Sequence, residues 1–137
     1  MIEINNAAGC RFDRRPLIKT AELFLKRFKL SGKDVSLAFV NSREMSRLNR
    51  LYRGKTGTTD VLSFEGEGDF LGEIVFDYDR IKKQAEELGH SAGKELRFIL
   101  IHGLLHLCGH DDATDKKRLA MIELGDRLLS DFSKKGL

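Results

Sequence analysis

Residues 96–109 read LRFILIHGLLHLCG. Apolar side chains fill nearly every position of this run, so a helix with 3.6 residues per turn would be apolar all round. A helix of that kind is buried inside its domain, and the rest of the chain must pack around it. We therefore predict a helix buried within the domain, with Ser91 as its N-cap and Gly109 at its C-terminal end.

Shorter patterns on both sides of this helix predict the elements that surround it. Apolar residues in strand-like patterns mark residues 2–4, 35–40, 61–64 and 71–76. Apolar residues at helical spacing mark 17–28, 41–52, 79–88 and 114–132, and they place Met45, Leu48 and Tyr52 on the buried face of the second of these helices. Because strands and helices are mixed in order, we predict a single α+β domain over residues 1–137, with a roughly four-stranded mixed sheet packed with about five helices.

Composition narrows the class of protein. Of the 137 residues, 41% are hydrophobic and 33% are charged, which is typical of a globular domain and excludes a disordered or fibrous chain. No apolar run is long enough to cross a bilayer, and the N-terminus lacks the basic and apolar segments of a signal peptide. Two cysteines, Cys10 and Cys108, do not suggest a disulfide scaffold, so we predict a cytoplasmic protein without membrane contact.

His102 and His106 are the two polar residues of the apolar helix that predict chemistry. Because they are four residues apart, they share one face, and both imidazoles can reach one tetrahedral metal ion. Gly109 permits a sharp reversal toward residues 110–112 (His-Asp-Asp), which offer a third ligand. Three protein ligands leave a position for water, as in catalytic zinc sites. Two histidines at this spacing alone also suit a hydrogen-bonded core pair, but the glycine and the polar triplet favour metal binding.

The run HGLLHLCGHDD at residues 102–112 resembles the signature of the YbeY-type rRNA maturation endoribonucleases. Residues 48–55 (LNRLYRGK) and 59–64 (TDVLSF) resemble the second motif of that family, and residues 71–74 (LGEI) its third. The resemblance implies a zincin-like active-site helix, one Zn²⁺ per chain, and cleavage of single-stranded RNA. It also implies a role in small-subunit rRNA maturation and ribosome quality control, with the small ribosomal subunit and its assembly factors as partners.

The third metal ligand departs from the family pattern. The position that usually holds a histidine is Asp112 here, and a carboxylate is an acceptable zinc ligand that also tolerates other divalent ions. His110 is the alternative ligand, although the helix end separates it from His106. Asp111 either orients a ligand or assists a proton transfer, or it is a turn residue beside Gly109.

Arginines supply the expected contacts with RNA. The resemblance assigns the family's functional arginine to Arg53, whose permanently charged fork suits a phosphate and its transition state. Arg43, Arg47 and Arg50 share one helix face, and Lys55 continues the positive charge into the next loop. This face either binds RNA or is simply solvated.

Two other functions remain open at this level. Peptidases of the H-E-x-x-H type use the glutamate after the first histidine as general base, but that position is Gly103 here. A hydrolase of peptides or small phosphoesters, or a ribosome-assembly factor with structural zinc, are the alternatives. The sequence leaves open the cleavage site, the base preference, the native metal, the oligomeric state, and whether water or the 2′-hydroxyl attacks phosphorus.

Overall fold

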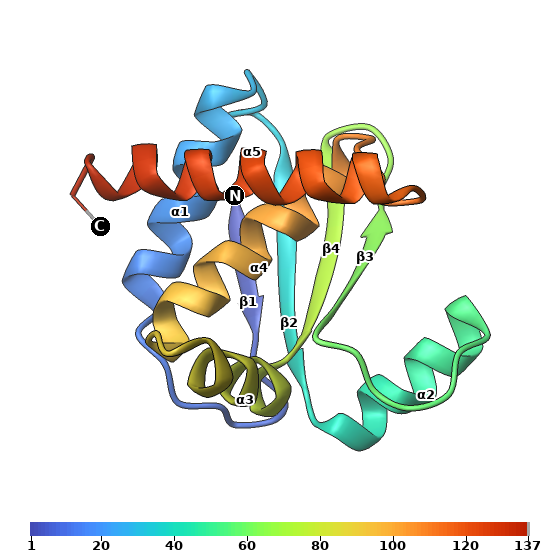
Figure 1. Cartoon of the computed structure of the whole chain (residues 1–137). Helices are drawn as coiled ribbons and strands as arrows, with labels where there is room; N and C mark the ends of the chain where they lie inside the picture. Colours follow the sequence, from blue (N-terminus) through green and yellow to red (C-terminus); the bar gives the residue numbers. More distant parts are fainter. Residues whose placement is uncertain (137) are drawn as a thin grey trace.

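The structure of the chain is a computed structural model that describes residues 1–136. These residues form one α+β domain, which confirms the predicted fold class (Figure 1). The strands are β1 (Ile2–Asn5), β2 (Asp34–Val40), β3 (Val61–Glu65) and β4 (Phe70–Asp77). The helices are α1 (Arg14–Arg27), α2 (Ser42–Arg53), α3 (Tyr78–Leu88), α4 (Ala92–Leu107) and α5 (Asp115–Ser133). No helix in residues 1–136 has both the length and the apolarity that a membrane crossing requires.

The sheet is mixed, in the order β1-β2-β4-β3. β1 and β4 both pair parallel with β2, whereas β3 pairs antiparallel with β4 and forms one edge of the sheet. Alternate residues of the strands enter two different cores, as the period of a strand requires. The larger core holds buried residues of the sheet together with those of α1, α3, α4 and α5, and the smaller core joins α2 to Leu62 and Val75 on the other face.

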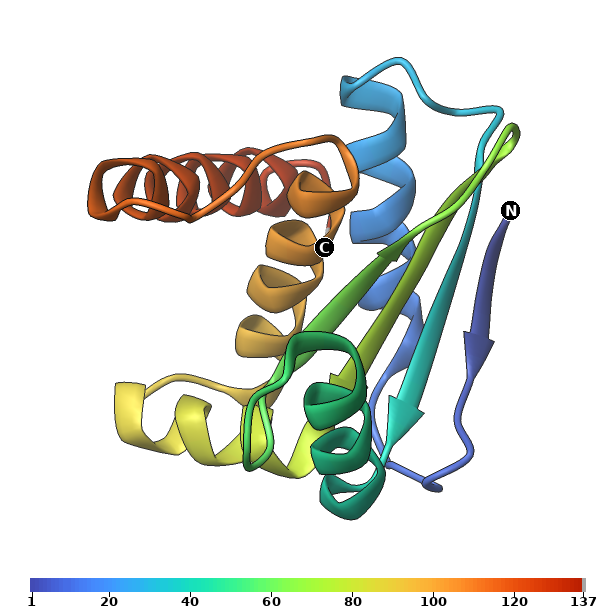
Figure 2. The same ribbon diagram turned by 90° about the vertical axis from the view of Figure 1, so that its right-hand side faces the viewer.

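Helix α4 lies at the centre of the larger core. It packs against α1, α3 and α5 and also against β3 and β4. In Figure 2, α4 lies between the sheet and α5, and α5 extends away from the strands. Its apolar residues are buried through most of its length, as the sequence predicts. Because α4 packs against β3, the side chains on that face of the helix lie next to this edge strand.

Side chains at the start of three helices act as N-caps, and among them Ser91 was predicted as the cap of α4. The Asn41 Oδ1 accepts a hydrogen bond from the Glu44 amide at 2.8 Å, and the Ser91 Oγ accepts one from the Lys94 amide at 3.1 Å. Thr114 caps α5 in the same way. Each cap satisfies one of the free N–H groups that a helix start leaves. These caps fix where α2, α4 and α5 begin.

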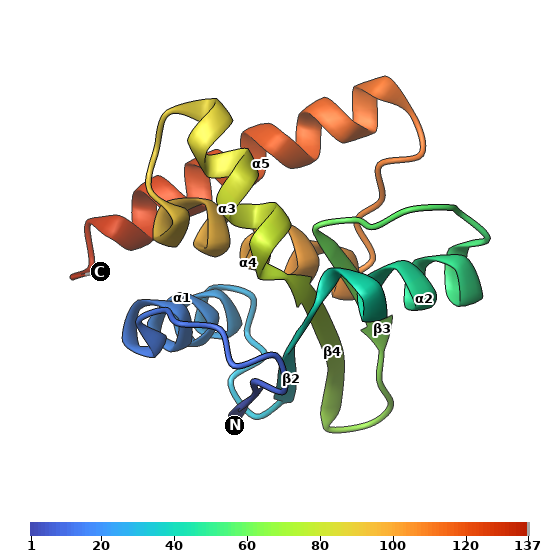
Figure 3. The ribbon, with the colours of Figure 1, turned by 90° about the horizontal axis from the view of Figure 1, so that it is seen from below.

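The predicted buried face of α2 is wrong in one residue. Tyr52 is 62% exposed, because α2 runs past the sheet and lies apart from the other four helices (Figure 3). Its ring meets the edge of the Phe64 ring instead, with centroids 5.1 Å apart. Asn49 is buried in its place, and its Nδ2 donates to the Gly57 carbonyl at 3.0 Å. The buried side of α2 thus holds Met45 and Asn49, and Asn49 anchors the loop that leads to β3.

Asp77 joins three elements at the end of β4. Its side chain is fully buried, and its Oδ2 accepts hydrogen bonds from the Ser42 Oγ and the Thr58 Oγ1, both at 2.7 Å. Its Oδ1 accepts from the Arg80 amide at 3.3 Å and caps α3. Because buried carboxylates are stable only when they are hydrogen-bonded, this arrangement fixes the start of α2, the loop before β3 and the start of α3 relative to one another.

Candidate metal centre

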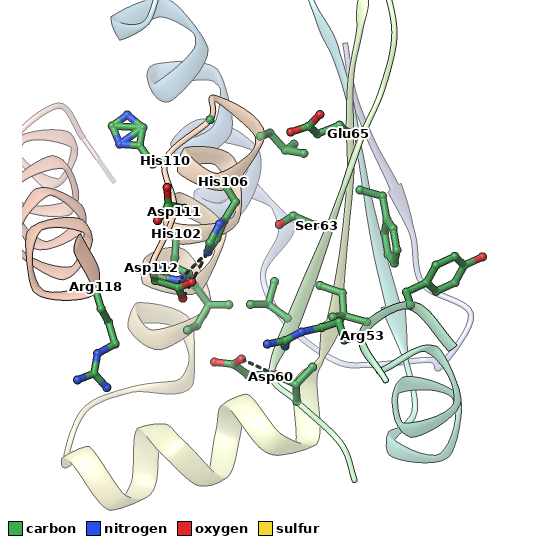
Figure 4. A pocket seen from close by; sticks show the side chains of 18 of the residues that line it. Arg53, Asp60, Ser63, Glu65, His102, His106, His110, Asp111, Asp112 and Arg118 are labelled. Carbon is green, nitrogen blue, oxygen red and sulfur yellow. Dashed lines mark hydrogen bonds and ion pairs between the residues drawn. The ribbon is translucent and has the colours of Figure 1, made fainter. Parts of the chain in front are cut away.

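Two histidines emerge from α4 one helical turn apart. The Nε2 atoms of His102 and His106 are 3.2 Å apart, and the rings are nearly perpendicular, at 76°. Their side chains are 18% and 28% exposed, although the rest of this helix segment is largely buried. Both Nε2 atoms therefore converge on one point at the surface of α4 (Figure 4).

Asp112 is the third member of this group. Gly109 has a φ of +93°, in the left-handed region that glycine adopts readily, and the chain turns back after it. The Asp112 Oδ2 then lies 3.8 Å from the His106 Nε2 and 4.0 Å from the His102 Nε2. Ligand atoms at zinc distances in a tetrahedral site lie about 3.3 Å apart, so a small closure of this triangle fits a metal. Two imidazoles and a carboxylate suit zinc and also other divalent ions. This group can bind a metal ion.

His110 lies outside the group of potential ligands. In Figure 4 its ring points away from the two histidines of α4. Asp111 is bonded within the turn, because its Oδ1 accepts from the Ala113 amide at 3.1 Å and its Oδ2 from the Lys117 Nζ at 3.3 Å. Those two hydrogen bonds, the backbone one first, lower the pKa of Asp111. Of residues 110–112, the structure brings only Asp112 to the histidine pair.

The electrostatics of the site favour a neutral His102. Burial lowers the pKa of His102 below its ordinary 6.5, and the neighbouring His106 lowers it further. The carboxylates of Asp112 and Asp60 oppose these two effects. A histidine binds metal through the lone pair of its neutral ring, so the burial of His102 favours the form that binds metal.

A cavity of about 880 Å³ opens in front of the three potential ligands. One wall comes from β3 and from Tyr52 and Arg53 at the end of α2, and the opposite wall from α5, with Arg118 and Ile122. In Figure 4, Arg53 and Asp60 lie on the side of β3 and Arg118 lies on α5. The cavity therefore brings two arginines and several carboxylates together with the histidine pair.

The basic residues of α2 differ in position. Arg53 lines the cavity, whereas Arg43, Arg47, Arg50 and Lys55 are exposed and do not contribute to its lining. The Arg47 guanidinium is held by Glu44, with contacts of 2.6–3.2 Å. The structure thus places the predicted catalytic arginine at the cavity and leaves the remaining basic residues on the outer surface of α2 and its loop.

Gly103 lies where α4 approaches the sheet closely. A Cβ atom at this position would lie 3.0 Å from the Ile74 Cγ2 and 3.2 Å from the Ser63 Oγ. Position 103 therefore faces the sheet, and a glutamate there would need a displacement of α4. The general base of an H-E-x-x-H peptidase has no equivalent in this helix, in agreement with the sequence interpretation.

Sequence reasoning missed Asp60 and Arg118 as residues of the cavity. Asp60 belongs to the motif at residues 59–64, so its presence in that motif was an available signal. Arg118 carries no local signal, because its position depends on how the turn at residues 109–114 directs α5 across the cavity.

Comparisons with known proteins give consistent results. A family model described as Endoribonuclease YbeY matches residues 5–133. The Endoribonuclease YbeY of Bacillus pumilus (strain SAFR-032) is 40% identical over 114 residues, which cover 72% of each chain. That of Nautilia profundicola is 42% identical over 118 residues, covering 84% of this chain and 81% of the relative. The solution structure of TM1509 from Thermotoga maritima is similar in fold, with a TM-score of 0.68 and 28% sequence identity over 98% of this chain and 91% of that one.

Proposed function

The chain belongs to the YbeY family of endoribonucleases, and we propose that it is a metal-dependent enzyme that cleaves single-stranded RNA in the maturation and quality control of small-subunit rRNA. The observation that carries the metal dependence is the convergence of His102, His106 and Asp112 in a cavity that also contains Arg53. On this proposal the single domain over residues 1–137 holds the whole active site. It acts in the cytoplasm on ribosomal RNA, together with the small ribosomal subunit and its assembly factors.

His102, His106 and Asp112 would hold one Zn²⁺ per chain, and Asp112 widens the choice to other divalent ions. When bound, zinc lowers the pKa of a coordinated water toward about 7 and polarises a phosphoryl oxygen. Asp111 is proposed to orient Asp112, because it holds the Asp112–Ala113 segment through the Ala113 amide and Lys117. His110 remains the alternative ligand only if the turn after Gly109 rearranges.

Arg53 is proposed to bind the scissile phosphate. Its planar fork matches two phosphate oxygens, and its charge opposes the negative charge that develops on them in the transition state. Arg43, Arg47, Arg50 and Lys55 would bind the RNA backbone on the outer surface of α2 and the next loop. Of these, Arg47 must first exchange its contact with Glu44.

Two observations argue against the alternatives. A peptidase of the H-E-x-x-H type lacks its base, because position 103 packs on Ile74 and Ser63. A purely structural zinc site is closed by four protein ligands, whereas this group has three and borders an open cavity, with Asp112 48% exposed. Three ligands with access to solvent favour a catalytic metal.

The test compares substrates and variants of metal-loaded protein. Wild type should cleave a single-stranded RNA, but neither the duplex of the same sequence nor the matching single-stranded DNA. Arg53→Ala should lower kcat/KM by about 10²–10³-fold. Arg27→Ala, on α1 and paired with Asp131, is the matched control and should stay near wild type. Wild-type activity in Arg53→Ala, or no RNA cleavage by metal-loaded wild type, would contradict the proposal.

A second arm separates the enzyme from an assembly factor. Cells whose only copy is Arg53→Ala should accumulate unprocessed small-subunit rRNA, since cleavage is lost while the fold is retained. Normal processing in those cells would favour the assembly-factor alternative. Cleavage of peptides or small phosphoesters in preference to RNA would favour another hydrolase.

A further inference from the structure

A chain of hydrogen-bonded side chains ends at Asp60 in the cavity wall. The Gln84 Nε2 lies 3.2 Å from the Asp60 Oδ2 and 3.2 Å from the Glu95 Oε2, so its two N–H groups can donate to both carboxylates. Glu95 is only 4% exposed, and its Oε1 lies 2.8 Å from the His90 Nε2. This series of hydrogen bonds therefore runs from the α3–α4 connection through the interior to the cavity.

Glu95 is a buried carboxylate whose partners bear on the cavity. A carboxylate taken out of water is unfavourable unless its oxygens are bonded, and here both oxygens have partners. His90 holds Glu95 on one side, and on the other side Glu95 accepts a hydrogen bond from Gln84. Glu95 therefore fixes the position of the Gln84 side chain. Gln84 in turn fixes the Oδ2 of Asp60, and the Oδ1 accepts a hydrogen bond from the Thr59 Oγ1 at 3.3 Å, while Asp60 as a whole stays partly exposed to the cavity. The arrangement orients a carboxylate toward the space where RNA is proposed to bind.

The other carboxylates of the cavity are less suited to accept a proton. Asp112 belongs to the proposed metal ligands, and Asp111 is bonded to the Ala113 amide and to Lys117. Glu65 is exposed at the end of β3, and within residues 1–136 no side-chain hydrogen bond holds it. Gly103 supplies no side chain. Asp60 is the cavity carboxylate that is fixed from behind by Gln84 and is not a potential metal ligand.

We propose that Asp60 is the proton acceptor of RNA cleavage and that Gln84 and Glu95 are its positioning residues, an inference that rests on the proposed function. Asp60 takes the proton of the attacking hydroxyl group, and the oxygen of that group forms the new bond to phosphorus. The bond between phosphorus and the leaving oxygen breaks, and the electron pair stays on the leaving oxygen, which takes a proton from solvent. Asp60 then releases its own proton to solvent, so that protons balance over one turnover.

The test is loss and chemical rescue of activity on single-stranded RNA. Asp60→Ala should lower kcat by about 10²–10⁴-fold, the range that general-base catalysis contributes. Added formate, a small carboxylate, should raise the kcat of Asp60→Ala at least about tenfold, because it can occupy the space that Asp60 leaves. This increase should saturate as the formate concentration rises. Glu67→Ala removes an exposed carboxylate outside the cavity, and this control should retain wild-type kcat. Arg53→Ala should lose activity that formate does not restore.

Binding readouts exclude a merely structural role. Asp60→Ala should keep wild-type metal content and should bind a non-cleavable 2′-deoxy oligonucleotide within about twofold of wild type. If Asp60→Ala does not fold, Asp60→Asn replaces it, since its side-chain oxygen can still accept from Gln84, and the same loss of kcat with an unchanged Tm is expected. The proposal would be overturned by full activity of either variant or by loss of the metal. It would also be overturned if folded Asp60→Ala lost activity that formate does not restore.

A separate variant tests whether Gln84 positions Asp60. Gln84→Leu should lower kcat about tenfold and leave KM unchanged, because Asp60 is present but no longer held. Lys83→Leu, the exposed neighbour on α3, is its control. If wild type cleaves RNA and Asp60→Ala is equally active, only this inference is overturned. A metal-loaded wild type that cleaves no RNA overturns the proposed function and this inference together.

Discussion

Gly103 on α4 and Ile74 on β4 are in such close contact that a Cβ atom at position 103 would lie 3.0 Å from the Ile74 Cγ2. Gly103→Ala should therefore destabilise the protein by about 1–3 kcal/mol, because an extra methyl group forces α4 away from the sheet. Urea denaturation measures this loss. Gly93→Ala is the control on the same helix, where the Cβ would meet only the flexible Arg97 side chain at 3.4 Å. It should be neutral or stabilising by up to about 1 kcal/mol, and equal losses in the two variants would contradict the close packing.

Asp77→Ala should cost about 2–4 kcal/mol, because it leaves the Ser42 and Thr58 hydroxyls without their acceptor and removes the cap of α3. Thermal or urea denaturation gives the loss directly. Asp79→Ala, two residues on and exposed, removes only a surface ion pair with Lys82 and should change stability by less than about 0.5 kcal/mol. Similar values for the two variants would show that the buried contacts of Asp77 do not join the elements.

Asn49→Ala should release the loop after α2. The Asn49 Nδ2 holds the Gly57 carbonyl at 3.0 Å, and this loop contains Lys55, where trypsin can cut. We expect faster tryptic cleavage after Lys55 and a stability loss of about 1–2 kcal/mol. Ser46→Ala on the same helix is the control. Unchanged cleavage at Lys55 in Asn49→Ala would mean that other contacts hold the loop.

The metal-free protein should lose stability as the pH falls through the range where His102 titrates. Burial, with His106 as the second cause, sets the folded pKa of His102 below its ordinary 6.5. Between the folded value and 6.5 the unfolded chain binds more protons, so stability rises with pH and is lost as pH falls from about 6.5 through the folded value. Urea midpoints of wild type should fall more steeply than those of His102→Gln between about pH 7.5 and 5.5. Parallel curves would contradict this assignment.

Much of the fold was predictable because its signals are local. Asn41, Ser91 and Thr114 each bond to an amide three residues on, so a cap needs only a short stretch of sequence. The apolar run of α4 likewise implies burial wherever the helix lies. Tyr52 was misplaced because its burial depends on how far α2 extends past the sheet, which the pattern of one helix does not contain.

The candidate site divides in the same way. His102 and His106 are placed by helical spacing alone, but the position of Asp112 depends on the turn at Gly109. The contacts behind Asp60 are beyond local reasoning, because Gln84 is 24 residues from Asp60 and 11 from Glu95. Nothing in the three segments indicates that they meet. Their convergence is a property of the packed fold.

Metal content of purified protein tests the central claim most directly. Wild type, His106→Ala, Asp112→Ala and His110→Ala are supplied with zinc, freed of excess, and measured by elemental analysis. We predict about one metal ion per chain in wild type and His110→Ala, and loss of the metal in His106→Ala and Asp112→Ala. No metal in wild type, or metal retained in Asp112→Ala and lost in His110→Ala, would contradict the proposed centre.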